Sequence, residues 1–172
     1  MSSKNDKFYL KLALNLAKQN EGLTNENPSV GCVIVKDNKI LSLSKTSISG
    51  RPHAEDNAIR FANTNDLKGS TIYVTLEPCT HHGKTPPCTD LIIKKKISKI
   101  VYASNDIDER TANKLKKVLK NHNISTKQIR MKEITDFYKS YFFIRKNKFP
   151  YITAKLACSN DYYIYSKKNK NI

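Results

Sequence analysis

The chain has 172 residues, with 31 Lys or Arg against 15 Asp or Glu, so its formal net charge at pH 7 is +16. This length predicts one domain with a proper hydrophobic core. No apolar run approaches the ~18–20 residues of a membrane span, and the polar N-terminus lacks the apolar region of a signal peptide. We therefore expect a cytoplasmic protein with no membrane partner.

The N-terminal part is expected to form two helices around a β-hairpin. Apolar residues recur at helical spacing over residues 6–20. Strands are predicted over 30–36 and 39–44, joined by Asp37-Asn38, because both of these turn residues tolerate a positive φ. The second helix is predicted over 52–62, since Pro52 suits a first helical turn.

Strands and helices then alternate. The predicted strands are 71–76, 100–103 and a weaker 127–131, and the predicted helices are 88–96, 112–121 and 135–146. This alternation indicates an α/β layer fold, with helices on both faces of a sheet that is mostly parallel after the initial hairpin. The last apolar run is 151–157, and the lysine-rich stretch 167–171 is expected to be a frayed tail.

The four cysteines point to metal or core positions before disulfides. Cys32 lies in a buried-strand pattern and is predicted to be a small core residue, whereas Cys158 has no partner motif. Only Cys79 and Cys88 have ligand-like surroundings, in a loop stiffened by prolines.

A histidine and a carboxylate complete a catalytic pattern with these two thiols. His53, Cys79 and Cys88 give three ligands for zinc, and a three-ligand site leaves a fourth position open for water. The order H-x-E followed by P-C and a second Cys is typical of zinc-dependent nucleobase deaminases. Glu55 is then the general acid and base, which takes a proton from water and returns it to the substrate.

Three segments carry a family resemblance. They read N-P-S-V-G-C-V-I-V at 27–35, G-R-P-H-A-E at 50–55 and Y-V-T-L-E-P-C-T-H-H-G-K-T-P-P-C at 73–88. With them the chain resembles the N-terminal deaminase domain of the bifunctional riboflavin-biosynthesis deaminase/reductase family, over nearly its whole length. Related transfer-RNA and cytidine deaminases close the site with a short P-C-x-x-C, but here eight residues separate the cysteines.

The resemblance implies a three-layer α/β/α cytidine-deaminase-like fold with a mixed central sheet. It also implies a substrate, 2,5-diamino-6-(5-phosphoribosylamino)pyrimidin-4(3H)-one, which is deaminated to the corresponding 5-aminouracil. Asn27, His81 and Lys84 match motif positions in loops that should line the pocket. Asn27 is a candidate for the ring edge, and Lys84 or His81 for the phosphate. The alternative for these three residues is ordinary loop structure.

The resemblance is weaker in two places. Asn113 and Asn123 stand where the family has glycine, and Asn is among the residues most tolerant of positive φ. Residues 149–172 resemble the start of the family's reductase domain but are too few to build it. We therefore expect a deaminase domain over 1–148, no use of NADPH by this chain, and a separate reductase as a candidate partner.

Two other functions stay open at this point. The positive charge favours a nucleic-acid base deaminase, but the lysines are scattered along solvent faces and the cysteine loop is long, so nucleic acid is not the expected substrate. A non-catalytic zinc-stabilised module is disfavoured by Glu55, because a structural site has no use for a free carboxylate. Association with a second copy through helix faces is not decided by the sequence.

Overall fold

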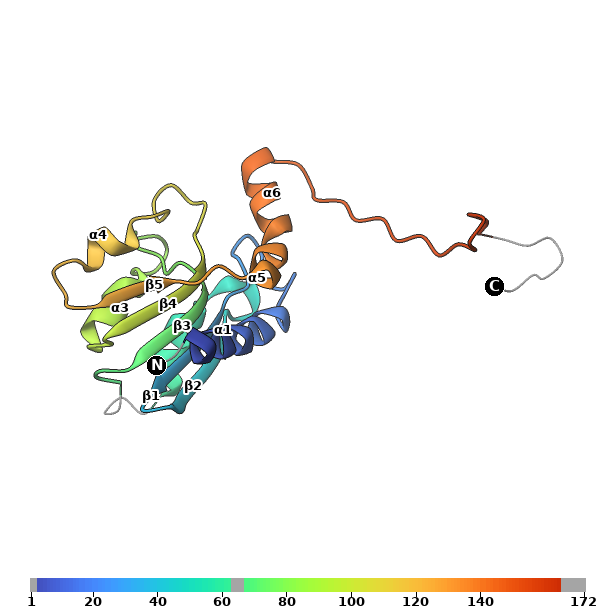
Figure 1. Cartoon of the computed structure of the whole chain (residues 1–172). Coiled ribbons are helices and arrows are strands. Elements are labelled where there is room, and N and C mark those ends of the chain that lie inside the picture. The colour runs from blue at the N-terminus through green and yellow to red at the C-terminus, as the bar shows by residue number, and fades with distance from the viewer. Residues whose placement is uncertain (1–2, 63–66, 165–172) are drawn as a thin grey trace.

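A five-stranded mixed sheet forms the centre of the molecule. The computed structural model describes residues 3–62 and 67–164 (Figure 1). The strands lie in the order β2-β1-β3-β4-β5. β1 pairs antiparallel with β2 and β3, whereas β3, β4 and β5 are parallel. Their bounds are β1 Gly31–Lys36, β2 Lys39–Lys45, β3 Thr71–Leu76, β4 Lys99–Ser104 and β5 Ser125–Gln128.

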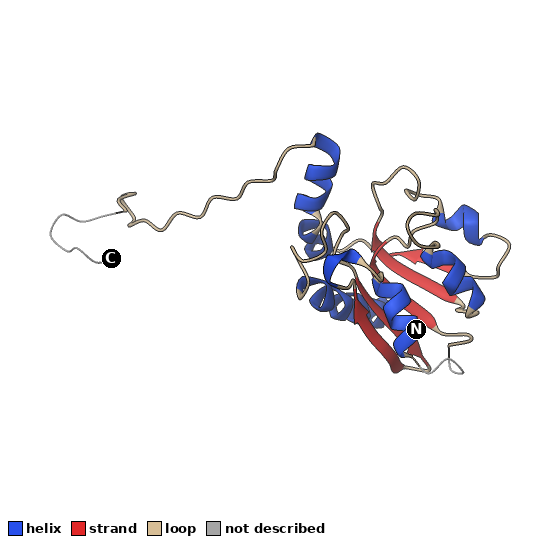
Figure 2. Ribbon diagram, turned by 180° about the vertical axis from the view of Figure 1, so that it is seen from behind, coloured by secondary structure: helices blue, strands red, loops and turns tan. Residues whose placement is uncertain are grey.

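Helices cover both faces of the sheet, so the predicted three-layer α/β/α architecture is confirmed (Figures 1 and 2). α1 covers one face, and an ion pair between Lys11 and Glu133 places α5 beside it. α2 and α3 lie on the opposite face, which is turned to the viewer in Figure 2. The described helices are α1 Ser3–Lys18, α2 Ala54–Phe61, α3 Cys88–Lys94, α4 Leu115–Leu119, α5 Lys132–Phe137 and α6 Lys139–Asn147, with a short 3₁₀ turn at Ile48–Gly50.

Several element boundaries differ from those predicted. α2 begins at Ala54, so Pro52 precedes the helix instead of opening it. The helix predicted over 112–121 shortens to α4, because Asn113 takes a φ of 60° and no helix can pass through it. The helix predicted over 135–146 is split into α5 and α6 at Tyr138, where ψ is 0°. The strand predicted over 127–131 lies slightly earlier, at β5.

Other local expectations hold. Asp37 and Asn38 have φ of 49° and 61° and connect the β1–β2 hairpin. Asn123 also has a positive φ, as expected of an asparagine at a glycine position. Cys32 is fully buried in the core between the helical layers.

Gly31 lets α1 pack directly against the first strand. A Cβ added at Gly31 would lie 1.8 Å from the carbonyl oxygen of Ala13 and 3.0 Å from the backbone nitrogen of Ala17. Both obstacles are main-chain atoms of a packed helix, so no side-chain rotation can relieve the clash. β1 therefore depends on a glycine for its distance from α1.

We expect Gly31→Ala to lower the free energy of unfolding by about 1–3 kcal/mol or more, the usual cost of forcing extra volume into a packed core. Urea unfolding followed by circular dichroism measures the change. Gly83→Ala is the matched control, because a Cβ there meets nothing closer than 3.8 Å. Equal stability of the two variants would show that α1 can move away from β1 without loss.

The C-terminal segment leaves the body of the domain. α6 projects from the sheet layers, and residues 149–164 run away from it as an extended chain (Figure 1). The apolar run 151–157 forms no strand, and its side chains are exposed. The predicted tail at 167–171 lies outside the described residues. Within the described part of the chain, no helix is long and apolar enough to cross a membrane.

Candidate active site

The candidate site lies where two parallel strands end and two helices begin. The loop that carries Cys79 follows β3, and the neighbouring segment 105–114 follows β4. The Glu77 amide donates to the Ser104 carbonyl at 2.8 Å, which holds the two strand ends together. Crevices at the carboxyl ends of parallel strands are the usual position for ligands in α/β folds.

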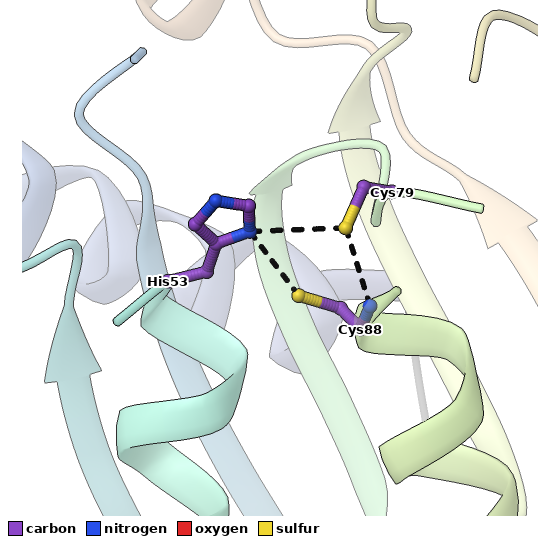
Figure 3. A group of neighbouring side chains, drawn as sticks. All are labelled: His53, Cys79 and Cys88. Carbon is purple, nitrogen blue, oxygen red and sulfur yellow. Dashed lines mark hydrogen bonds between the residues drawn. The ribbon is translucent and has the colours of Figure 1, made fainter. Parts of the chain in front are cut away.

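His53, Cys79 and Cys88 converge from three separate segments (Figure 3). His53 is the residue before α2 and has an extended backbone, so it lies at the N-cap and not in the first turn as predicted. Cys79 lies in the loop after β3, and Cys88 is the first residue of α3. The loop between them is closed by Thr89, whose amide and hydroxyl both donate to the Cys79 carbonyl at 3.3 Å.

The geometry of the three side chains fits a zinc ion. His53 Nδ1 lies 3.7 Å from Cys79 Sγ and 3.4 Å from Cys88 Sγ, and all three donor atoms lie within 4.8 Å of one another. Tetrahedral zinc with bonds of ~2.0–2.1 Å to nitrogen and ~2.3 Å to sulfur would hold such a pair ~3.6 Å apart. One imidazole and two thiols are also a donor set that zinc prefers.

The two sulfurs already differ in their ionisation. A hydrogen bond from Cys88, assisted by His53, lowers the pKa of Cys79 to about 4. The Cys88 backbone amide also donates to Cys79 Sγ, at 3.2 Å. The bond with Cys79 and burial raise the pKa of the Cys88 thiol well above its ordinary value. A bound cation would favour ionisation of both sulfurs.

Glu55 is a buried carboxyl group next to this cluster. It lies in the first turn of α2, two residues after His53, and is only 4% exposed. Burial, and after it the charge of Cys79, raise the pKa of Glu55 to about 7. The pKa of His53 is also raised, chiefly by its bond with Cys79. A carboxyl group in this position can exchange protons with a molecule bound at the cluster.

A cavity of about 100 Å³ opens in front of His53, Glu55 and Cys79. Two of the three predicted substrate-binding residues, Asn27 and His81, line it. Asn27 is held in place because its side-chain amide donates to the Gly50 carbonyl at 3.0 Å. His81 Nδ1 lies 2.9 Å from the Thr111 hydroxyl. Lys84 is exposed in the same loop as His81 and is not among the residues that line the cavity.

Eight further polar or charged residues that line the cavity were not predicted. They are Thr46, Arg51, Glu77, Asp106, Asp108, Arg110, Tyr141 and Arg145. Asp106 and Asp108 follow a parallel strand, which is a signal that sequence reasoning could have used. Arg110 donates through Nε to Asp108 at 2.9 Å and holds the pKa of Asp108 well below its usual range. Nothing in the sequence marks Tyr141 and Arg145, which reach the cavity from α6.

Arg51 lines the cavity and lies two residues before His53 in the sequence. Its Nε atom is buried and has no hydrogen-bond partner among the described residues. A buried donor without a partner is uncommon and is often satisfied by a ligand or by water. Arg51 is therefore a candidate for contact with a bound anion.

Known proteins with similar sequences include named deaminases and riboflavin biosynthesis proteins. Residues 3–104 match the family described as cytidine and deoxycytidylate deaminase zinc-binding region. The chain is 42% identical over 147 residues to diaminohydroxyphosphoribosylamino-pyrimidine deaminase of Buchnera aphidicola subsp. Acyrthosiphon pisum, and this match covers 85% of the chain and 99% of the relative. It is 43% identical over 157 residues to riboflavin biosynthesis protein RibD of Aquifex aeolicus.

The match to RibD proteins is partial on their side. It covers 91% of this chain but 44% of the Aquifex protein, so the chain spans less than half of that relative's length. Among solved structures, Acinetobacter baumannii RibD superposes with a TM-score of 0.78 at 36% identity. That superposition covers 86% of this chain and 42% of the Acinetobacter chain.

Proposed function

Because the chain belongs to the cytidine and deoxycytidylate deaminase family, and within it to the diaminohydroxyphosphoribosylaminopyrimidine deaminases, we propose that it deaminates 2,5-diamino-6-(5-phosphoribosylamino)pyrimidin-4(3H)-one. Water replaces one ring amino group, which leaves as ammonia, and the product is 5-amino-6-(5-phosphoribosylamino)uracil. The observation that carries this proposal is that one imidazole and two thiols converge, and that the imidazole, one of the thiols and a buried carboxyl group line one small cavity.

His53, Cys79 and Cys88 are the proposed zinc ligands. Zinc held there would supply the Lewis acidity that makes water a nucleophile at neutral pH. Cys79 is the sulfur that ionises first, since the Cys88 amide and thiol both donate to it. The hydrogen bonds from the Thr89 amide and hydroxyl to the Cys79 carbonyl close the cysteine loop, and so keep both sulfurs near the imidazole.

Glu55 is the proposed proton carrier. Its carboxylate accepts a proton from the attacking water and then donates it to a ring nitrogen of the substrate. The amino group leaves as ammonia after it has received a proton by the same route. Burial of Glu55 at 4% exposure keeps bulk water from competing for this proton.

The cavity indicates how the substrate would lie. Sites that enclose a drug-sized ligand usually measure ~300–1,000 Å³, and this cavity of about 100 Å³ can enclose little more than the pyrimidine ring. The ribosyl phosphate would then extend towards the opening. Asn27 is proposed to contact the ring edge, and His81, Lys84 and Arg51 are the candidates for the phosphate.

Lys84 is tested by its effect on binding of the phosphorylated substrate. Because the side chain is exposed, Lys84→Ala should raise KM by only about 2–5-fold, as expected for a solvent-screened charge pair, and should leave kcat unchanged. The effect should fade at high salt. Steady-state kinetics with the phosphorylated and dephosphorylated substrates measure this. An equal rise in KM for the two substrates would show that Lys84 is part of the loop structure only. The same measurement on Arg51→Ala gives the comparison with a basic residue that lines the cavity.

The proposed function is tested with the purified chain. Its zinc content is measured, and ammonia release is followed with the diaminopyrimidine ribotide and, separately, with transfer RNA. We expect about one zinc per chain and release from the ribotide alone. Release from transfer RNA alone would replace the proposal with a nucleic-acid deaminase. We propose that the deaminase unit is residues 1–148. NADPH followed in the same assay should stay unoxidised, because the deamination proposed for this unit uses water and no reductant.

A further inference from the structure

Glu77 is a buried carboxyl group that the proposed reaction does not use. It directly follows β3, lies two residues before Cys79 and is 3% exposed. Its carboxylate accepts three backbone N–H groups, from Asp106 at 3.4 Å, Asn113 at 3.1 Å and Leu115 at 3.3 Å. All three donors belong to the segment between β4 and the start of α4.

That segment, residues 105–115, forms one wall of the cavity. It supplies Asp106, Asp108 and Arg110 to the lining, which also includes His53, Glu55 and Cys79. It also contacts the cysteine loop twice. The Thr111 hydroxyl lies 2.9 Å from His81 Nδ1, and the Thr80 hydroxyl donates to the Arg110 carbonyl at 3.3 Å.

The wall has little regular structure of its own. Residues 105–114 form turns and irregular backbone, and Asn113 takes a positive φ. Such a segment keeps its shape only if its backbone groups find partners outside a helix or strand. Glu77 satisfies three of them at once, and two of these, on Asp106 and Asn113, share the Oε2 atom.

A carboxylate is suited to this task. When ionised it only accepts hydrogen bonds, with about four lone-pair sites on two oxygens. A glutamine would keep one oxygen, but its NH₂ group would face backbone N–H donors. The three bonds to Glu77 therefore require a carboxylate and not merely a polar side chain of that length.

We propose that Glu77 is a positioning residue for substrate binding. Its carboxylate fixes the wall 105–115 relative to the loop that carries Cys79 and His81. Glu77 itself borders the cavity, but both of its carboxylate oxygens are engaged by backbone N–H groups of the wall. The width of the cavity, and hence the affinity for the aminopyrimidine substrate, then depends on Glu77 through the position of the wall. This inference rests on the proposed function for its substrate, but the hydrogen bonds to the wall are independent of it.

Glu77→Gln tests the proposal through a split between KM and kcat. We expect KM to rise about 10-fold or more, the effect of disrupting hydrogen bonds to a charged group. The expected fall in kcat is less than about 3-fold, and the zinc content should stay at the wild-type value, since Glu55 and the ligands are untouched. Glu133→Gln is the matched control, because Glu133 is an exposed acid on α5. A fall in kcat or a loss of zinc at unchanged KM would overturn the positioning role.

Backbone hydrogen exchange provides the readout that does not depend on activity. The amides of Asp106, Asn113 and Leu115 should exchange faster in Glu77→Gln, whereas the amides of β1 and β3 should not change. Unchanged exchange at the wall would overturn the proposal. Faster exchange throughout the sheet, with an unchanged KM, would reduce Glu77 to a support of the fold.

Thr111→Val provides a second variant if Glu77→Gln does not fold. It removes the contact between the same wall and His81 and should also raise KM without loss of zinc. If KM stays at the wild-type value, the position of the wall does not control affinity. If the wild-type chain releases no ammonia from the ribotide, the proposed function fails by itself, and the exchange measurement still decides whether Glu77 holds the wall.

Discussion

Glu55→Gln is expected to retain zinc and the fold while it loses about 10²–10⁴-fold in kcat, the usual contribution of general acid–base catalysis. The amide keeps the shape of the side chain and its hydrogen-bonding capacity in a site that is only 4% exposed. It cannot accept a proton from water and pass it to the substrate. Stopped assays of ammonia release, together with zinc content and circular dichroism, measure the three properties separately.

Asp56→Asn is the matched control for Glu55→Gln. It makes the same chemical change one residue further along α2, where the carboxylate pairs with Arg60 on the surface. Its kcat should match that of the wild type. A Glu55→Gln enzyme with wild-type kcat would remove Glu55 from the mechanism and would favour a zinc module without catalysis.

His53→Ala is expected to abolish activity by a different route, through loss of the metal. His53 Nδ1 faces both sulfurs, so its removal leaves two ligands on one side of the site. Loss of a group that only orients a ligand costs ~10–100-fold in metal affinity, and loss of the ligand itself should cost more. Zinc content after dialysis against a weak chelator measures this.

His82→Ala is the control for His53→Ala. His82 lies in the same cysteine loop, but its side chain is 78% exposed and its Nε2 lies 3.9 Å from an Asp90 carboxylate oxygen. Zinc content and activity should stay at wild-type values. Full zinc retention in His53→Ala would mean that another residue replaces it, and the ligand set proposed here would be wrong.

Much of the architecture follows from local sequence patterns. The β-branched and apolar runs of β1, β3 and β4 have the composition of buried strands, and the Asp37-Asn38 pair specifies the hairpin turn. Patterns of this kind depend on a few neighbouring residues, so they can be interpreted without knowledge of the rest of the fold. The errors in the helices fall at their boundaries, before α4 at Asn113 and between α5 and α6 at Tyr138, because backbone breaks there depend on tertiary hydrogen bonds as well as on propensity.

The sequence by itself determined the residues proposed for the chemistry, namely His53, Glu55, Cys79 and Cys88, because their spacing and order form a pattern that rarely arises by chance. Only the tertiary structure decided what surrounds them. Arg51, Asp106, Arg110 and Arg145 reach one cavity from segments far apart in the chain, and Lys84 does not line it. The sequence around a polar loop residue shows the same pattern whether its side chain faces water or a cavity. The register of β3 with β4 and the bonds to Glu77 hold the segment that carries Asp106 and Arg110 beside this cavity.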